Sequence, residues 1–314
     1  MWAASAAGME GMPSMTELTP FYDDVQSHYD LSDEFFALFL DPTRTYSCAY
    51  FERDEMTLEE AEIAKIDLAL GKCDLEPGMT LLDVGCGWGS TLLHAVEKYD
   101  VNVIGLTLSR NQHRCASELL ENRSATHRSA EVRLQGWEDF DQPVDRIVSI
   151  GAFEHFRRER YDAFFDRCNT LLPDDGRMLL HTIVGFNRHQ IRDKGLPINR
   201  EIMEFGKFIQ YEIFPGGQLP EPQWVVDGAN RAGFTVERVH PLQLHYARTL
   251  DCWAEALQKR RDEAIEVASE DTYNTYVKYL TGCADYFRKG YIDIMQFSLA
   301  KPTARPLPAK FSQG

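Results

Sequence analysis

Short apolar runs alternate with helical stretches through most of this chain, and this alternation constrains the fold more than any other feature. Between the runs, apolar residues recur three and four positions apart, which is the spacing of one helix face. Strands that alternate with helices in this way usually pair in parallel, with helices on both faces of the sheet. The pattern predicts five strands, at residues 80–84, 101–106, 131–135, 145–150 and 177–182.

Two later apolar runs, at residues 234–239 and 292–299, predict a closing antiparallel pair. The expected fold is therefore an α/β domain with a seven-stranded, doubly wound sheet. A single domain over about residues 20–301 accounts for all of these elements. We expect the ends, residues 1–19 and 302–314, to be a flexible extension and a disordered tail, because they are small, polar or proline-containing and show no periodicity.

Two segments are additions to the alternating unit. Residues 20–79 are helical in pattern and rich in aromatic side chains, and residues 187–220 are inserted after the fifth strand. The insertion has apolar residues on one helical face and ends in a Pro-Gly-Gly turn. It is either a helix packed on the core or a lid over an apolar substrate pocket.

The composition excludes several classes of protein. Acidic residues outnumber basic ones by 49 to 33, a net charge of −16, which argues against a general nucleic-acid binder. The seven cysteines include no CxxC pair, so we expect reduced thiols and no metal site. No apolar run approaches the length of a membrane span, and the N-terminal residues do not resemble a signal peptide. These features predict a cytoplasmic protein.

A glycine-rich segment, DVGCGWGS at residues 83–90, directly follows the first strand and opens a helix. Glycines there allow close backbone approach to a ligand, and the helix N-terminus attracts an anionic group. A dinucleotide enzyme is one interpretation, with Asp100 at a suitable distance for a ribose contact. However, the third glycine, Gly89, comes one position too early for that fingerprint, and Ser90 stands where glycine or alanine is expected. The spacing instead resembles that of S-adenosylmethionine (SAM) methyltransferases.

The second strand ends in GLTLSRNQ, residues 105–112. Most methyltransferases of this fold have an acidic residue at this point for the ribose hydroxyls, whereas this chain has Thr107. The departure narrows the choice of family. With this departure and five longer motifs, the chain closely resembles the mycolic acid cyclopropane synthases and methyltransferases of mycobacteria. The motifs are TYSCAYFERDEMTLEEAEIAKIDLAL, PVDRIVSIGAFEHF, EIFPGGQLP, HYARTL and YLTGCADYFRKGYIDIMQF.

The resemblance runs from about residue 20 to 300 and implies a class I SAM methyltransferase fold. Trp137 and Glu138 follow the third strand, at the edge where ligands of open α/β sheets bind, and they could contact the adenine by stacking and by accepting its amino hydrogens. The implied cofactor site comprises Tyr46, Ser47, Asp83, Gly85, Gly87, Thr107, Gln112, Trp137 and Glu138.

The resemblance also implies a second site, which holds a bicarbonate ion that acts as a base. Glu154 and His181 lie at the ends of adjacent predicted strands and would converge on one crevice. Taken singly, a buried cysteine or histidine is more often part of the core. The matching positions are Cys48, Ile150, Glu154, His181 and Tyr246, where Ile150 would contribute backbone.

The implied activity is SAM-dependent C-methylation of double bonds in very long, meromycolic acyl chains, with cyclopropane formation through a carbocation as the leading outcome. Methyl-branching or hydroxylating members of the same family are the alternative, because the product depends on water access and base placement. A non-catalytic acyl-chain binder on the same fold and an ordinary small-molecule methyltransferase are the other hypotheses.

A long acyl chain would need an apolar tunnel and a carrier. The family implies acyl carrier protein, an acidic partner, and the basic cluster at residues 157–160 could receive it. A solvated helix start explains that cluster equally well. The aromatic candidates for the tunnel wall are Phe35, Phe36, Phe39, Phe205, Phe208, Tyr211, Phe214, Tyr246, Tyr279 and Phe287.

Overall fold

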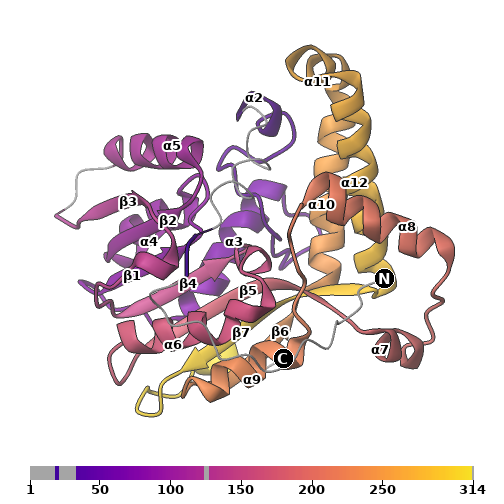
Figure 1. The fold of residues 1–314 in the computed structure, drawn as a ribbon. Coiled ribbons are helices and arrows are strands. Elements are labelled where there is room, and N and C mark those ends of the chain that lie inside the picture. The colour runs from indigo at the N-terminus through magenta and orange to yellow at the C-terminus, as the bar shows by residue number, and fades with distance from the viewer. Residues whose placement is uncertain (1–17, 21–32, 124–126, 313–314) are drawn as a thin grey trace.

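A single seven-stranded sheet organises the protein (Figure 1). The computed structural model describes residues 18–20, 33–123 and 127–312. Across the sheet the strand order is β3-β2-β1-β4-β5-β7-β6. The strands are β1 (Thr80–Val84), β2 (Asn102–Thr107), β3 (Ala130–Leu134), β4 (Arg146–Ile150), β5 (Arg177–Gly185), β6 (Thr235–Pro241) and β7 (Ile292–Ala300).

Strands β1 to β5 are parallel, and β7 lies antiparallel between β5 and β6. The predicted seven-stranded sheet with a closing antiparallel pair is therefore confirmed. The clearest difference is the length of β5, which continues beyond the predicted residue 182 to Gly185. The extension follows from the partner strand, because β7 pairs along its whole length, from Ala300 opposite Arg177 to Ile292 opposite Gly185.

Helices connect the strands and cover both faces of the sheet. Helix α3 begins with a capping box, in which the Thr57 hydroxyl accepts from the Glu60 amide and the Glu60 carboxylate accepts from the Thr57 amide. The helices are α2 (Asp33–Phe36), α3 (Leu58–Lys72), α4 (Ser90–Tyr99), α5 (Arg110–Glu121), α6 (Tyr161–Leu171), α7 (Arg188–Asp193), α8 (Arg200–Phe208), α9 (Pro222–Arg231), α10 (Gln243–Lys259), α11 (Arg261–Val267), α12 (Glu270–Lys289) and α13 (Ala309–Ser312), with short turns η2 (Trp137–Asp139), η3 (Phe153–His155), η4 (Arg158–Arg160) and η5 (Ile209–Ile213).

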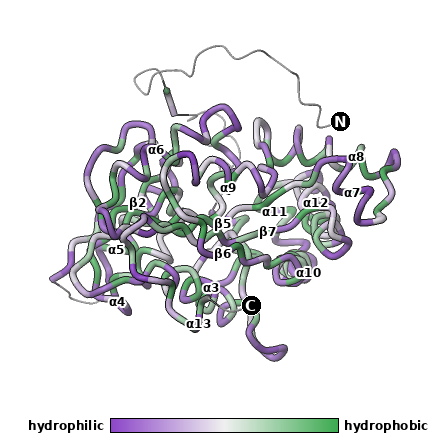
Figure 2. The backbone as a smooth tube through the Cα atoms, turned by 90° about the horizontal axis from the view of Figure 1, so that it is seen from below, coloured by the Kyte–Doolittle hydropathy of each residue, from purple (hydrophilic) through white to green (hydrophobic). Residues whose placement is uncertain are grey.

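The two faces of the sheet belong to separate hydrophobic cores, because alternate residues of a strand point to opposite sides. Leu81 and Leu179 pack with α3 and α4 on one face. Leu82 and Leu180, their neighbours in the chain, pack with α6 and α9 on the other. In Figure 2 apolar residues gather along the central strands, whereas hydrophilic residues dominate outer helices such as α7.

A third core lies beyond the edge of the parallel strands. It joins α2, α10, α11 and α12, which Figure 1 shows with α10, α11 and α12 rising together on one side of the sheet. Its centre is aromatic, and the rings of Phe35 and Tyr276 meet edge to face with centroids 5.0 Å apart. The predicted N-terminal helical segment thus contributes two helices: α2 packs in this core, and α3 packs against the sheet.

The insertion at residues 187–220 forms α7, α8 and the π-helical turn η5. Helix α8 packs against α12, and the Phe205 ring lies on Gly282. The centroids of the Phe205 and Tyr286 rings are 4.6 Å apart. A Cβ at position 282 would overlap the Phe205 ring, so glycine is what allows the two helices to approach. The Tyr286 hydroxyl also donates to the Ile202 carbonyl, 2.8 Å away.

The prediction of a disordered C-terminal tail is wrong for the described residues, 302–312. Leu307 and Phe311 are buried, and Phe311 lies in the short helix α13, where its ring packs over Gly71 of α3. Long-range apolar contacts hold the tail in place rather than regular local structure, so the sequence shows no periodicity that could have indicated this order. Of the predicted N-terminal extension, residues 1–17 lie outside the described residues.

Within the part of the chain that the structure describes, no helix is long and apolar enough to cross a membrane.

Replacement of Phe311 by alanine tests the docking of the tail. We expect Phe311→Ala to lower the free energy of unfolding by about 1–3 kcal/mol, because loss of the ring leaves an unfilled space over Gly71. Urea denaturation measures the change, with Pro306→Ala at an exposed tail position as the control. Equal denaturation midpoints for the two variants would contradict the assignment.

Candidate active site

The glycine loop between β1 and α4 has a backbone that side chains would not tolerate. Gly85, Gly87 and Gly89 have φ angles of +88°, +54° and +94°, in the left-handed region that favours glycine. At Gly85 a Cβ would also collide with the Cβ of Ala152, on the loop that follows β4. Glycine therefore allows this loop to pass close to the β4 loop.

Helix α4 starts at this loop without a side-chain cap. Its N-cap residue is Gly89, which has no side chain to satisfy the first amides, and the first turn carries no acidic residue. The first amides of a helix lack intrahelical partners and carry the positive end of the helix dipole. This end of α4 is therefore suited to an anionic group of a ligand.

A cavity of about 1010 Å³, including space open to solvent, lies over the loop at the carboxyl ends of the parallel strands. All nine residues of the predicted cofactor site contribute to its wall. They come from the segment before α3, from β1 and the loop after it, from the end of β2, from the first turn of α5 and from η2. These residues are Tyr46, Ser47, Asp83, Gly85, Gly87, Thr107, Gln112, Trp137 and Glu138.

Two carboxylates in this wall have a buried oxygen that no described residue satisfies, Oδ1 of Asp83 and Oε2 of Glu138. Burial raises the pKa of Asp83 to about 7, against the opposing effect of Lys65, and burial also raises the pKa of Glu138. A buried polar atom without a partner costs free energy, so these oxygens are suited to accept hydrogen bonds from a ligand. SAM carries an ammonium, ribose hydroxyls and an adenine amino group that can donate them.

The other oxygen of Glu138 is held by Arg160, whose Nη1 lies 2.9 Å from Oε1 and also donates to the Thr19 carbonyl. Arg160 belongs to the basic cluster that the sequence assigned to a carrier protein or a solvated helix start. Its side chain is instead mostly buried against Glu138, a residue that lines the first cavity. Arg158 of the same cluster stacks on Trp224, with its guanidinium carbon 3.8 Å from the ring centroid.

Thr107, which stands where an acidic residue is usual, is tied to its neighbours. Its hydroxyl donates to Gln112 Oε1 at 2.9 Å and accepts from the Ser109 amide at 3.1 Å. The Ser109 hydroxyl in turn caps the start of α5 by accepting from the Gln112 amide at 3.3 Å. The uncharged pair of Thr107 and Gln112 therefore presents a rigid polar edge to the cavity in place of a carboxylate.

A second cavity of about 950 Å³, including space open to solvent, adjoins the first. The two share wall residues, namely Tyr46, Ser47, Gly151 and His155. Apolar side chains of η5, α10, α12 and β7 form most of the second wall. The contributing residues include Ile209, Phe214, Leu219, Tyr246, Leu250, Tyr279, Phe287 and Ile294.

Several aromatic candidates for the tunnel do not reach this cavity. Phe35, Phe36 and Phe39 are buried in the aromatic centre of the third core, and Tyr211 points outward with 70% of its surface exposed. Phe205 and Phe208 pack against that core from the insertion. The five phenylalanines are apolar for reasons of packing, which residue type alone could not distinguish from a role in lining a cavity.

The five positions of the predicted bicarbonate site separate into two groups. Glu154 and Tyr246 line the second cavity, and Ile150 lines the first. Cys48 and His181 have no exposed surface and belong to neither wall. The structure thus brings three of the predicted positions to the cavities and places the other two in the buried layer behind them.

Glu154 is the acidic group of the second cavity. Its Oε1 accepts from the Ile183 amide at 2.6 Å, while Oε2 is buried without a partner among the described residues. Burial raises the pKa of this carboxyl group. Burial likewise raises the pKa of the Tyr246 hydroxyl well above its usual value, so Tyr246 remains a hydrogen-bond donor.

Cys48 and His181, the two buried positions, are both uncharged. The Cys48 thiol donates to the Ala49 carbonyl at 3.2 Å, and burial raises its pKa well above the usual value, so it stays protonated. Burial, reinforced by Lys65 and Lys72, lowers the pKa of His181 well below its usual value. His181 is therefore a neutral imidazole, and no residue in the described part of the chain contacts its Nε2 by a hydrogen bond.

Three charged residues of α3 were missed by sequence reasoning. Glu62, Lys65 and Lys72 are buried on the face that packs against the sheet, in line with Ile66 and Ala69. Their spacing of three and seven positions matches that of the apolar residues, and this was the signal available in the sequence. Together the three form a buried polar layer beside the cavities.

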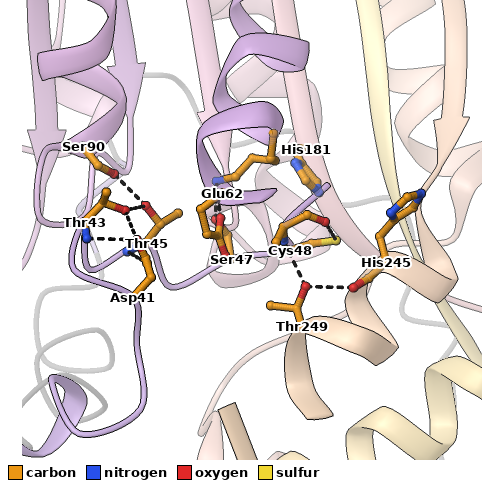
Figure 3. A network of polar contacts seen from close by, with 12 residues as sticks. Asp41, Thr43, Thr45, Ser47, Cys48, Glu62, Ser90, His181, His245 and Thr249 are labelled. Atoms are coloured by element: carbon orange, nitrogen blue, oxygen red, sulfur yellow. Dashed lines mark hydrogen bonds and ion pairs between the residues drawn. The ribbon is translucent and has the colours of Figure 1, made fainter. Parts of the chain in front are cut away.

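Lys65 links this layer to the cofactor cavity, whose wall it joins. Its Nζ donates to the Ser47 hydroxyl at 2.7 Å and lies 3.4 Å from Glu62 Oε2. Burial raises the pKa of Glu62 to about 8 against the opposing effect of Lys65. Figure 3 shows Glu62 beside Ser47, with Cys48 and His181 next along the same layer.

A glycine loop on a seven-stranded sheet, with a cavity at the strand ends, defines a class I SAM-dependent methyltransferase. The fold is shared by coclaurine N-methyltransferase bound to S-adenosylhomocysteine (SAH), with a TM-score of 0.73, 24% identity, and coverage of 88% of this chain and 80% of that one.

The family model for mycolic acid cyclopropane synthetase matches residues 16–297. Cyclopropane mycolic acid synthase 1 of Mycobacterium tuberculosis is 62% identical over 285 residues, which cover 91% of this chain and 99% of that protein. The chain belongs to the mycolic acid cyclopropane synthase family.

Solved structures agree with this membership. The cyclopropane synthase MmaA2 from Mycobacterium tuberculosis superposes with a TM-score of 0.89 at 60% identity, over 91% of this chain and all (100%) of that one. The mycolic acid cyclopropane synthase CmaA1 complexed with SAH and CTAB has a TM-score of 0.88 at 62% identity, with the same coverage of 91% and 100%.

Gly85→Ala tests the glycine loop. We expect the substitution to weaken SAM binding at least about tenfold, because the new methyl group meets Ala152 and the positive φ is strained. Isothermal titration calorimetry with SAM measures the change. Gly195→Ala is the matched control, since Gly195 has a φ of +72° with open space around it, away from the cavity. Equal affinity of both variants would contradict the assigned role.

Asp83→Asn tests the raised pKa of the buried carboxyl. The unfolded chain releases this proton near pH 4, whereas the fold retains it to about pH 7. Ionisation of Asp83 in the unfolded chain therefore lowers the free energy of unfolding of the ligand-free protein increasingly across that window. The stability of Asp83→Asn relative to wild type should therefore rise between pH 4 and 7, by roughly 1.4 kcal/mol for each step of one in pH. Urea denaturation at a series of pH values measures it, and a difference independent of pH would refute the assignment.

Proposed function

We propose that this protein transfers the methyl group of SAM to a carbon–carbon double bond of a long acyl chain and closes it into a cyclopropane ring. The observation that carries the proposal is the pair of adjoining cavities, which share Tyr46, Ser47, Gly151 and His155. One has polar groups suited to SAM, and the other is apolar, with Glu154 as the carboxylate among its described wall residues. Relatives about 60% identical bear the name cyclopropane mycolic acid synthase, which supports the same reaction.

The chemistry explains why the second cavity is dry. An isolated alkene is a weak nucleophile, so the sulfonium methyl and the double bond must be held in line without water. The π electron pair forms the new C–C bond while the S–CH₃ bond breaks and leaves SAH. The other alkene carbon becomes a carbocation, which water would capture as an alcohol. An apolar wall therefore favours ring closure.

Charge and aromatic faces stabilise that cation. Ionised Glu154 has one oxygen committed to the Ile183 amide and one available toward the cavity. The rings of Tyr246 and Phe287 lie in contact, with centroids 4.7 Å apart, on the same cavity wall. A ring face attracts a cation, and a fixed negative charge in an apolar site acts strongly on it.

Ring closure needs a base that removes one proton from the transferred methyl group, so that the C–H electron pair forms the third side of the ring. A bicarbonate ion, when bound, would supply that basic oxygen. Two observations fit such an ion, which both accepts and donates hydrogen bonds: His181 Nε2 and Glu154 Oε2 are buried polar atoms without partners among the described residues. Tyr246 would donate a hydrogen bond from its hydroxyl, Ile150 would contribute backbone, and Cys48 is the fifth of the matching positions.

The insertion at residues 187–220 is proposed to close the substrate cavity. Ile209 and Gln210 of η5 and the turn at Gly217 contribute to its wall. The Gln218 amide donates to the Glu154 carbonyl at 2.9 Å, which ties the insertion to the catalytic loop. A π-helical turn such as η5 is often found at functional sites.

Acyl carrier protein is the proposed carrier of the acyl chain. With Arg160 mostly buried and paired with Glu138, Arg157 and the exposed Arg158 are the cations of the cluster that would face an acidic partner. The overall charge of −16 would repel such a partner elsewhere on the surface.

Incubation of the purified protein with methyl-labelled SAM and a cis-monounsaturated long acyl chain tests the function. The acyl chain is supplied on acyl carrier protein, on coenzyme A or as the free acid. Mass spectrometry should show a product heavier by one CH₂, and NMR should show cyclopropane protons. A methyl-branched alkene or alcohol as product would contradict ring closure and support the methyl-branching or hydroxylating activity. The absence of any labelled lipid would contradict methyl transfer and support a non-catalytic acyl-chain binder.

Glu154→Gln tests the catalytic carboxylate. We expect turnover to fall about 10²–10³-fold, because the cation loses a fixed negative charge. SAM affinity should be unchanged, since Glu154 lies in the wall of the second cavity only. Initial rates and calorimetry measure the two effects, with the exposed Glu97→Gln as the matched control. Undiminished turnover would remove Glu154 from the mechanism.

A further inference from the structure

Three polar side chains lie across the antiparallel end of the sheet. In the strand register His181 of β5 is opposite Gln296 of β7, and Gln296 is opposite His240 of β6. Residues directly opposite in such a ladder project to the same face. His181 is two positions from Leu179, so this face is the one covered by α3.

Helix α3 places the Lys72 ammonium over this row. Its Nζ donates to Gln296 Oε1 at 2.6 Å and contacts His240 Nδ1 at 3.0 Å. Gln296 continues the chain through its Nε2, which lies 3.3 Å from His181 Nδ1. Gln296 and His181 have no exposed surface, and Lys72 is 2% exposed.

The donor and acceptor roles in the hydrogen-bonded series Lys72–Gln296–His181 are fixed from one end. An ammonium has three donors and no acceptor, so Gln296 must turn its carbonyl oxygen to Lys72. The amide group then faces His181 as a donor, and His181 Nδ1 must accept. In a neutral imidazole with a bare Nδ1 the proton resides on Nε2. This nitrogen is buried without a partner among the described residues.

We propose that Lys72, acting through Gln296, is a positioning residue that holds His181 as its Nε2–H tautomer, so that a buried N–H is presented to an anion. A lone buried donor is costly unless a ligand accepts from it. The ligand of matching chemistry is a small oxyanion. Its assignment as the base of ring closure rests on the proposed function, whereas the tautomer does not.

The titratable and charged groups around Lys72 affect whether its side chain is protonated. Arg238 and His240 face it from β6, His181 from β5, and Cys73 follows it at the end of α3. Burial, with a contribution from Arg238, lowers the pKa of Lys72 to about 7. The ammonium form therefore predominates at pH 6, which is the condition for the test.

Long-range ¹H–¹⁵N correlation spectra of the full chain, labelled at its nine histidines, report which ring nitrogen carries the proton. The His181 signals are identified by their loss in His181→Gln. In the wild type at pH 6 we expect a protonated Nε2 and a bare Nδ1. A protonated Nδ1 with a bare Nε2 would overturn the proposal, whatever the activity of the enzyme.

Gln296→Glu is the sharpest variant, because it keeps the shape and replaces the donor toward His181 by an acceptor. Lys72 can still pair with the carboxylate, while His181 must now donate from Nδ1. We expect the proton to appear on Nδ1 and turnover to fall about 10–100-fold, with unchanged SAM affinity. A His181 spectrum identical to that of the wild type would overturn the proposal.

Two controls separate positioning from damage to the fold. Gln142→Glu makes the same chemical change at an exposed amide and should leave the His181 spectrum and turnover unaltered. Lys72→Met removes the donor and should give a mixture of both tautomers, since Gln296 can then rotate. If the tautomer shifts as expected but no lipid product forms with the wild type, the proposed function fails and the tautomer assignment stands.

Discussion

Everything at this site depends on the convergence of parallel strand ends at one edge of the sheet. Because β1, β2, β3 and β4 run the same way, the loops after them meet at that edge. The glycine loop, the Thr107 edge, Trp137 with Glu138, and Glu154 come from four such loops. The antiparallel β7 then pairs with β5, β6 forms the edge of the sheet beyond it, and α10 and α12 complete the wall of the apolar cavity.

The buried polar layer of α3 is the second constraint. Charged groups in a protein interior are expensive unless they are paired, and the pair itself is weak evidence for stability. Here the charges bear on the active site: Lys65 orients Ser47, and Lys72 contacts Gln296 beside His181. A helix that only filled space would carry apolar residues at these positions. The presence of charged residues instead points to control of protonation beneath the cavities.

Sequence patterns predicted the order of strands along the chain, because strand and helix periodicities are local features. The family resemblance named nine cofactor positions, and all nine lie in the wall of the first cavity. The resemblance assigned Glu154, Tyr246, Cys48 and His181 to one bicarbonate site. In the structure Glu154 and Tyr246 line the second cavity, whereas Cys48 and His181 are fully buried and line neither cavity. Sequence patterns missed Lys65 and Lys72 because a lysine on a helix is normally solvated, and its burial depends on the whole sheet.

The sequence by itself determined the class of fold, the family and the glycine loop that lines the first cavity, since these follow from the order of short motifs. Only the tertiary structure decided which aromatic rings line a cavity and which fill a core, that Arg160 holds Glu138, and that Phe311 anchors the tail on Gly71. Each of these is a contact between residues far apart in the chain. Residue type and local spacing carry no record of such distances, which packing alone sets.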